Sequence, residues 1–152
     1  ARRRADGSLF SCRHNLQYWR GLPYRGLGAG AHGYAAGWRT ANIGPILAYI
    51  QKIDKGTQLP FPRSPANQQS HLVSRQDEQA EYMMVGLRLA DEGVSNVEFE
   101  QRFGQPLVQA YPRQIEALGR AGLLEWVGEK ERRLRLTRRG RLLGNQVFVQ
   151  FI

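Results

Sequence analysis

The chain has 152 residues and a formal net charge of +9, with 41% hydrophobic and 23% charged residues. This composition is typical of a globular chain long enough for one ordinary domain or two small ones. No apolar run approaches the roughly 18 residues of a membrane span and no secretory leader is visible, so we expect a cytoplasmic protein without a membrane span. The single cysteine, Cys12, excludes an internal disulfide and cannot supply the roughly three or four thiolates that hold an iron–sulfur cluster.

The first residues carry no signal for a helix or a strand. Ala1 is followed by three arginines without an apolar pattern, which we interpret as the start of a piece of a longer protein. The positive charge is concentrated in residues 1–76, whereas acidic and basic residues are balanced in residues 77–152. A basic excess often indicates nucleic-acid binding, but here it accompanies an aromatic segment.

That aromatic segment is residues 13–33, RHNLQYWRGLPYRGLGAGAHG, which place a histidine, aromatic residues and arginines before a glycine-rich turn. We expect a loop here. Tyr18 and Trp19 lie side by side, and exposed aromatic side chains cost free energy unless something covers them. The segment is therefore the first candidate for a binding site.

Gly28, Gly30 and Gly33 match the G-x-G-x-x-G pattern of dinucleotide-binding proteins. That pattern requires a buried strand before the glycines and a helix after them, whose N-terminus meets the pyrophosphate. The flanking residues predict neither element. We therefore interpret the glycines as allowing close backbone packing or irregular turns.

A short amphipathic helix is predicted from Pro45 to Gly56, with Pro45 in the first turn and Gly56 as a left-handed cap. Its apolar residues recur at helical spacing. The following residues, 57–76, contain three prolines and several Gln, Ser and Asn residues without an apolar period, which predicts a linker.

Helices are expected in the second half where apolar residues recur at helical spacing between caps. Ser95 and Glu98 have the spacing of a capping box, and Gly104 suits the left-handed end of the helix that follows. A proline is tolerated only at a helix start, so Pro112 opens its own helix. The predicted elements are a helix at 77–89, a helix at 95–104, a turn at 106–110 and a main helix at 112–121 capped by Gly122.

A β-hairpin is predicted next, because residues 133–136 alternate strictly between Arg and Leu after a turn at Gly128–Glu131. Thr137 can cap a last helix that runs through Phe148. Three helices, a hairpin and a closing helix are the element order of a winged-helix domain. The fold class predicted is α+β, with a small winged-helix-like C-terminal domain after a partly irregular N-terminal part.

Winged-helix domains often bind DNA, and the predicted wing at 130–141 is rich in basic residues. The helix that would enter the groove offers few cations, and Glu116 among them repels phosphate. We expect no specific nucleic-acid binding. The basic wing is better interpreted as a solvated face or as a surface that packs on another domain.

Two sets of motifs carry a resemblance to a known family. CRHNLQYW followed by YRGLGAGAHGY resembles the HNxxYW segment and glycine-rich stretch of the radical-SAM haem chaperones of the HemW type, relatives of oxygen-independent coproporphyrinogen III oxidase. EYMMVGLRLADEGVSNVEFEQRFG, IEALGRAGLLEW and LRLTRRGRLLGNQVFVQFI are similar, in order and spacing, to that family's C-terminal domain. The resemblance covers nearly the whole chain from Ser11 onward.

The sequence departs from the family in one respect: it lacks the N-terminal barrel with the CxxxCxxC cysteines that bind a [4Fe–4S] cluster and S-adenosylmethionine. The resemblance therefore implies that this chain cannot perform radical chemistry alone, and it leaves open whether the parent protein is an enzyme. It also implies that residues 1–56 are the C-terminal edge of the radical-SAM domain, that 57–76 are a linker and that 77–152 are the winged-helix-like domain.

The resemblance implies a parent protein that binds haem and passes it to haem-requiring proteins, with the HNxxYW segment as a haem contact. The residues fit that chemistry, because imidazole ligates haem iron, aromatic rings pack on porphyrin and arginine pairs with propionates. His14 is the candidate iron ligand, and His32 and Cys12 are second choices. The remaining candidates for haem contact are Asn15, Tyr18, Trp19, Arg13, Arg20 and Arg25.

Alternatives remain open. His14 and Asn15 can instead hydrogen-bond to the backbone, while Tyr18 and Trp19 pack on a missing barrel. The chain can also be a fragment of a coproporphyrinogen III oxidase-type enzyme, whose tetrapyrrole substrate shares the carboxylates of haem but has no iron. A DNA-binding winged helix is the weaker third alternative. A comparison of the binding of haem with that of metal-free protoporphyrin distinguishes the haem chaperone from the coproporphyrinogen III oxidase-type fragment.

Overall fold

The computed structural model describes residues 12–129 and 132–152, apart from the side chain of Arg13. The expected turn at Gly128–Glu131 and the start of the predicted wing therefore lie partly outside the described residues. The chain divides into two compact units. The N-terminal unit comprises Ala1–Tyr18 and Leu22–Arg75, and the C-terminal unit comprises Trp19–Gly21 and Gln76–Ile152.

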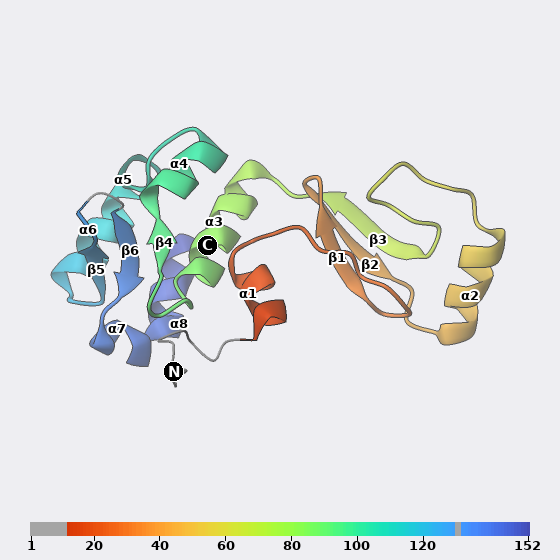
Figure 1. Cartoon of the computed structure of the whole chain (residues 1–152), viewed down its shortest axis with the longest axis horizontal. Coiled ribbons are helices and arrows are strands. Elements are labelled where there is room, and N and C mark those ends of the chain that lie inside the picture. Colours follow the sequence, from red (N-terminus) through yellow and green to blue (C-terminus); the bar gives the residue numbers. More distant parts are fainter. Residues whose placement is uncertain (1–11, 130–131) are drawn as a thin grey trace. The chain divides into compact units, whose positions relative to one another are not determined.

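The N-terminal unit is built on a three-stranded antiparallel sheet with the order β1-β2-β3 (Figure 1). Its strands are β1 (His32–Ala35), β2 (Trp38–Asn42) and β3 (Asn67–Leu72). Ala36 and Gly37 connect β1 to β2, and both have positive φ angles, 49° and 76°. A two-residue turn of this kind matches the twist of a β-hairpin. The N-terminal part is therefore irregular only in part, because residues 32–42 form a hairpin.

Residues 57–76 are not simply a linker, because β3 lies within them. Along β3 every side chain after the first is exposed, so the strand shows no apolar alternation. Backbone pairing with β2 holds it instead, from Trp38 opposite Leu72 to Asn42 opposite Asn67. A strand stabilised by its ladder with little side-chain burial leaves no hydrophobic period in the sequence.

Two helices complete the elements of this unit within residues 12–75, and both differ in part from expectation. The aromatic segment begins as a helix, α1 (Arg13–Trp19), because residues 13–19 contain no glycine or proline to interrupt it. Helix α2 (Ile46–Lys55) starts after Pro45 as predicted, but Gly56 ends it with an extended φ of −77°. None of the α2 side chains is buried, and α2 lies at one end of the sheet (Figure 1).

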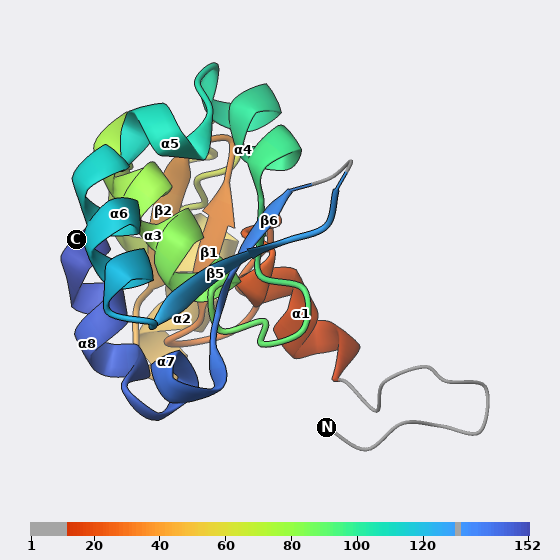
Figure 2. The ribbon, with the colours of Figure 1, turned by 90° about the vertical axis from the view of Figure 1, so that its left-hand side faces the viewer.

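The C-terminal unit combines short helices with the antiparallel sheet β4-β6-β5 (Figure 2). Together the two units form a mixed α/β chain with two small antiparallel sheets. The elements of the C-terminal unit are α3 (Arg75–Gly86), β4 (Val94–Ser95), α4 (Asn96–Phe103), α5 (Leu107–Ala110), α6 (Pro112–Arg120), β5 (Leu124–Val127), β6 (Arg133–Leu136), α7 (Arg138–Leu142), α8 (Gly144–Phe148) and the 3₁₀ turn η1 (Val149–Phe151).

Most of these elements match the prediction, and the caps explain why. The Ser95 hydroxyl accepts the backbone N–H of Glu98 at 3.3 Å, and Gly104 ends α4 with a φ of 69°. The Thr137 hydroxyl accepts the N–H of Gly140 at 3.0 Å. These predicted caps are therefore confirmed. Each cap depends on residues a few positions apart, which is why the sequence predicts it.

Two boundaries were predicted wrongly in this unit. Helix α3 ends at Gly86, not at residue 89; a Cβ at Gly86 would lie 2.7 Å from Val94 Cγ2, so β4 packs close to the helix end. The last helix is interrupted at Leu143, whose φ of −110° and ψ of 23° are not helical. It therefore forms α7 and α8 rather than one helix.

The hydrophobic core of this unit is continuous. Phe99 is fully buried, and its ring centroid lies 4.7 Å from that of Phe103 and 6.0 Å from that of Tyr82. Burial of each large apolar side chain contributes about 1.5–3 kcal/mol to folding. Among the described residues, no helix is both long enough and apolar enough to cross a membrane.

Candidate functional site

Three aromatic rings form a row on the N-terminal unit, which we call the aromatic row: His14, Tyr18 and Tyr24. The ring centroids of His14 and Tyr18 are 4.9 Å apart, with the planes at 80°. Those of Tyr18 and Tyr24 are 4.5 Å apart, with the planes at 65°. His14 is exposed and Tyr18 is 36% exposed. The row therefore presents an imidazole and a phenol ring to solvent.

The row follows from two local structures. His14 and Tyr18 are four residues apart on α1, so their side chains lie on one face of the helix. Tyr24 forms a β-bridge with Tyr34 in β1, with N–O distances of 2.7 and 2.9 Å in the two directions. The sheet thus fixes Tyr24, and the helix fixes the other two rings.

The other predicted members of the motif are not gathered in this row. Trp19 is half-buried and belongs to the C-terminal unit. Adjacent helical residues point in different directions, so Trp19 does not share the helix face of His14 and Tyr18. Asn15 is exposed on α1. The structure brings Tyr24 into the row, although sequence reasoning did not select it; its place five residues after Trp19 was the only available signal.

The three candidate arginines differ in what they contact. Arg20 donates to both carboxylate oxygens of Glu92, at 3.0 and 3.1 Å. The Arg25 guanidinium carbon lies 5.3 Å from the ring centroid of Phe61, and the side chain is exposed. The side chain of Arg13 lies outside the described part of the structure. Arg25 is thus the described candidate that shares the N-terminal unit with the aromatic row.

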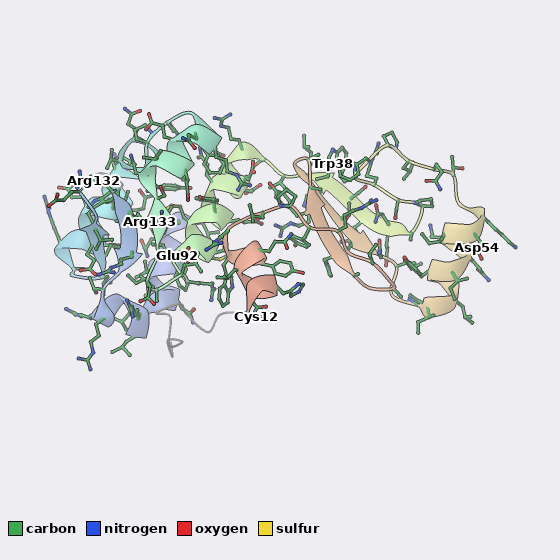
Figure 3. The ribbon with its side chains drawn as sticks, viewed as in Figure 1. Cys12, Trp38, Asp54, Glu92, Arg132 and Arg133 are labelled. Atoms are coloured by element: carbon green, nitrogen blue, oxygen red, sulfur yellow. The ribbon has the colours of Figure 1, made fainter. Side chains whose placement is uncertain are left out.

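The second-choice metal ligands occupy separate elements. His32 is exposed at the start of β1, opposite Ala41. Cys12 is exposed immediately before α1, where its carbonyl oxygen accepts the N–H of Leu16 at 3.1 Å (Figure 3). Within residues 12–129 and 132–152, no group of three or more His, Cys, Asp or Glu side chains is placed to hold a metal ion.

A buried amide holds the glycine-rich loop. The Asn42 side chain is 8% exposed, and its NH₂ donates to the carbonyl oxygens of Gly26 and Gly28, at 3.2 and 2.9 Å. The Asn67 NH₂ in turn donates to Asn42 Oδ1 at 2.7 Å. Gly33 lies in strand β1 and not at the start of a helix. The glycine-rich loop therefore lacks the helix N-terminus that a dinucleotide-binding loop places at the pyrophosphate.

Beside this loop lies a cavity of about 150 Å³. Its lining includes aromatic rings, hydroxyl groups and one guanidinium: Tyr24, Arg25, Tyr34, Thr40, Tyr49 and Ser64. The Tyr49 hydroxyl accepts the N–H of Gly28 at 3.3 Å. Sequence reasoning gave no signal for the cavity, because its lining residues come from five separate segments of the chain.

Three arginines of the predicted wing make contacts within the C-terminal unit. The guanidinium of Arg132 stacks 4.8 Å from the ring centroid of Trp126, and Arg133 Nε donates to the carbonyl oxygen of Glu92 at 2.8 Å (Figure 3). Arg135 pairs with Glu125 at 2.8 Å. The carboxylate of Glu125 offsets the charge of Arg135, whereas the contacts with the Trp126 ring and the Glu92 carbonyl occupy the guanidinium groups of Arg132 and Arg133 without neutralising them.

Helix α6, the helix expected to enter a DNA groove, carries its own ion pair. Arg120 binds Glu116 at 2.5 Å, one turn earlier on the helix. The pair is largely exposed, so it contributes little to stability. It nevertheless places a carboxylate beside one of the few cations of α6.

The fold of the C-terminal unit and its motifs define the class of domain. Residues 73–143 match the family described as HemN C-terminal domain. The solved structure of coproporphyrinogen III oxidase (HemN) from Escherichia coli, described as a radical SAM enzyme, is similar with a TM-score of 0.59 and 19% identity, over 86% of this chain and 28% of that chain. Residues 73–143 are therefore similar to the HemN C-terminal domain.

Proteins named heme chaperone HemW are similar over a longer part of the chain. That of Bacillus subtilis is 39% identical over 141 residues, which are 92% of this chain and 34% of that protein. That of Lactococcus lactis is 32% identical over 143 residues, or 94% and 34%. The predicted resemblance is confirmed, and the chain spans about a third of the length of these relatives.

Proposed function

We propose that this chain is the haem-binding C-terminal part of a HemW-type chaperone, which holds haem as cargo and passes it to haem-requiring proteins. The observation that supports this most is the aromatic row, which ends in an exposed imidazole 4.9 Å from the ring of Tyr18. The names of the similar proteins support the same cargo.

The row and Arg25, which follows Tyr24 in the chain, fit haem in three respects. The imidazole of His14 would supply a nitrogen ligand for the haem iron. The Tyr18 ring offers an aromatic surface for the porphyrin face, and Arg25 offers a planar pair of donors for a propionate. Cargo that must be handed over needs an accessible site, and His14 and Tyr18 are exposed.

The residues do not fit a [4Fe–4S] cluster, because Cys12 is the only cysteine of the chain. We assign the cluster and S-adenosylmethionine to a preceding domain of the parent protein, for which the N-terminal unit forms the C-terminal edge. The C-terminal unit is then the winged-helix-like domain. Radical chemistry is no part of what this chain does by itself.

The row also suits a tetrapyrrole without iron, which is why a coproporphyrinogen III oxidase-type fragment is the second candidate. The similarity of the fold to the Escherichia coli structure favours it. The two candidates differ at His14, because an imidazole gains a bond from iron and none from a metal-free ring.

The test is a spectroscopic titration of the chain with ferric haem and with metal-free protoporphyrin. We expect haem to shift its Soret band on binding and His14→Ala to abolish that shift, with no effect on protoporphyrin. His71→Ala is the matched control, because His71 is an exposed histidine on β3 of the same unit. Equal haem spectra for the wild type and His14→Ala would overturn the proposal.

We expect no specific binding of duplex DNA. Arg132, Arg133 and Arg135 of the β5–β6 hairpin make contacts within the unit, and Glu116 lies beside Arg120 on α6. Any affinity for DNA should therefore be that of a generic basic protein and fall steeply as salt rises. Sequence-preferring binding at physiological salt would contradict this expectation.

A further inference from the structure

We propose that the cavity beside the glycine-rich loop is a subsite for one carboxylate arm of the bound tetrapyrrole, recognised by Arg25 and the hydroxyl of Tyr49. This inference rests on the proposed function, because it assigns the propionate subsite of the same ligand. It adds a second contact to the ligand, remote from the iron.

The first argument is location. Tyr24 belongs to both features: its ring lies 4.5 Å from that of Tyr18 in the aromatic row, and it lines the cavity. Arg25, the next residue, also lines the cavity. A flat ligand on the row therefore has its edge beside the cavity.

The second argument is size. The cavity volume of about 150 Å³ holds roughly five groups of the size of a water molecule. That is enough for a propionate arm and far too little for a porphyrin ring. The cavity thus suits a substituent of a ligand whose ring stays outside, on the exposed row.

The third argument is chemistry. The lining contains no Asp or Glu among the described residues, while Arg25 contributes a cation. The Tyr49 hydroxyl accepts the N–H of Gly28, which leaves its proton available, since no described residue accepts it. The hydroxyls of Thr40 and Ser64 add two further possible donors. Donors and positive charge without carboxylates favour an anionic guest.

The fourth argument is preorganisation. Asn42 holds the loop by its bonds to Gly26 and Gly28, and Asn67 holds Asn42. A Cβ at Gly33 would lie 2.8 Å from Thr40 Oγ1, so only glycine lets β2 place this hydroxyl where it stands. A fixed cavity loses little entropy when a carboxylate enters.

The experiment compares haem with haem dimethyl ester, which keeps the iron and the ring but blocks both carboxylates. We expect the wild-type chain to bind haem about tenfold more tightly than the ester, the usual effect of one charge-assisted hydrogen bond. Arg25→Gln should remove this difference, and Tyr49→Phe should reduce it by about threefold. Neither variant should change the affinity for the ester or the position of the Soret band.

Arg63→Gln is the matched control, because Arg63 belongs to the same unit but stacks on Trp38, 4.8 Å from its ring centroid. It should leave the preference for haem unchanged. Equal wild-type affinities for haem and ester, or an Arg25→Gln variant that weakens both ligands equally, would overturn the subsite while leaving the proposed function intact. Absence of any His14-dependent Soret shift would overturn the proposed function and the subsite together.

Discussion

Replacement of Asn42 tests whether one buried amide holds the glycine-rich loop on the sheet. Asn42→Ala removes the bonds to Gly26, Gly28 and Asn67, at 3.2, 2.9 and 2.7 Å. At about 1 kcal/mol of net stability for each hydrogen bond, the loss is about 3 kcal/mol. Asn42→Asp should cost at least as much, because a carboxylate oxygen then faces two carbonyl oxygens.

The assay is amide hydrogen exchange of the full chain, followed by mass spectrometry on peptides from β1 and β2. A loss of about 3 kcal/mol should accelerate exchange through local opening on the order of 100-fold in these strands. Gln69→Ala is the control, because Gln69 is exposed on β3 opposite Ala41. Wild-type exchange rates in both Asn42 variants would refute the reasoning.

Three further predictions concern the C-terminal unit. Phe99→Ala should lower the free energy of unfolding in urea by about 3–5 kcal/mol because the ring is fully buried, whereas Val97→Ala, at a position 43% exposed, should change it little; similar losses would contradict this. Ser95→Ala should cost about 1 kcal/mol, because it removes the cap of α4, and an unchanged thermal midpoint would count against the cap. Burial, with a smaller contribution from Glu98, raises the pKa of Tyr82 above its ordinary value, so the neutral phenol stabilises the folded state. The contribution of Tyr82 to the free energy of unfolding should therefore be fully present below about pH 10 and fall as the pH rises further. Tyr82→Phe should make the free energy of unfolding, measured in urea, depend less steeply on pH in this range. The same pH dependence in the variant and the wild type would exclude Tyr82 as the cause.

Much of the C-terminal unit could be predicted because its signals are local. The caps at Ser95, Gly104 and Thr137 involve partners a few residues away. The N-terminal sheet could not be predicted in the same way, because β3 is polar and depends on β2. The turn at Ala36–Gly37 lacks the Asn-Gly or Asp-Gly pair that most strongly indicates a hairpin.

The candidate site was predicted in part, for physical reasons. His14 and Tyr18 were both selected from the HNxxYW segment, and their rings lie in contact on one helix face, although the segment was expected to be a loop. Trp19 was grouped with Tyr18 because they are adjacent, although adjacent side chains diverge on a helix. The partner of Arg20 is Glu92, which is 72 positions away, and no local pattern reveals such a pair.

The measurement that tests the central claim most directly is resonance Raman spectroscopy of the reduced haem complex of the full chain. If His14 is the iron ligand, the wild type and His71→Ala should show an iron–histidine stretching band, and His14→Ala should lack it. The same variants should keep equal far-ultraviolet circular dichroism, because both histidines are exposed. An iron–histidine band that persists unchanged in His14→Ala would contradict the assignment of this residue and, with it, the haem site on α1.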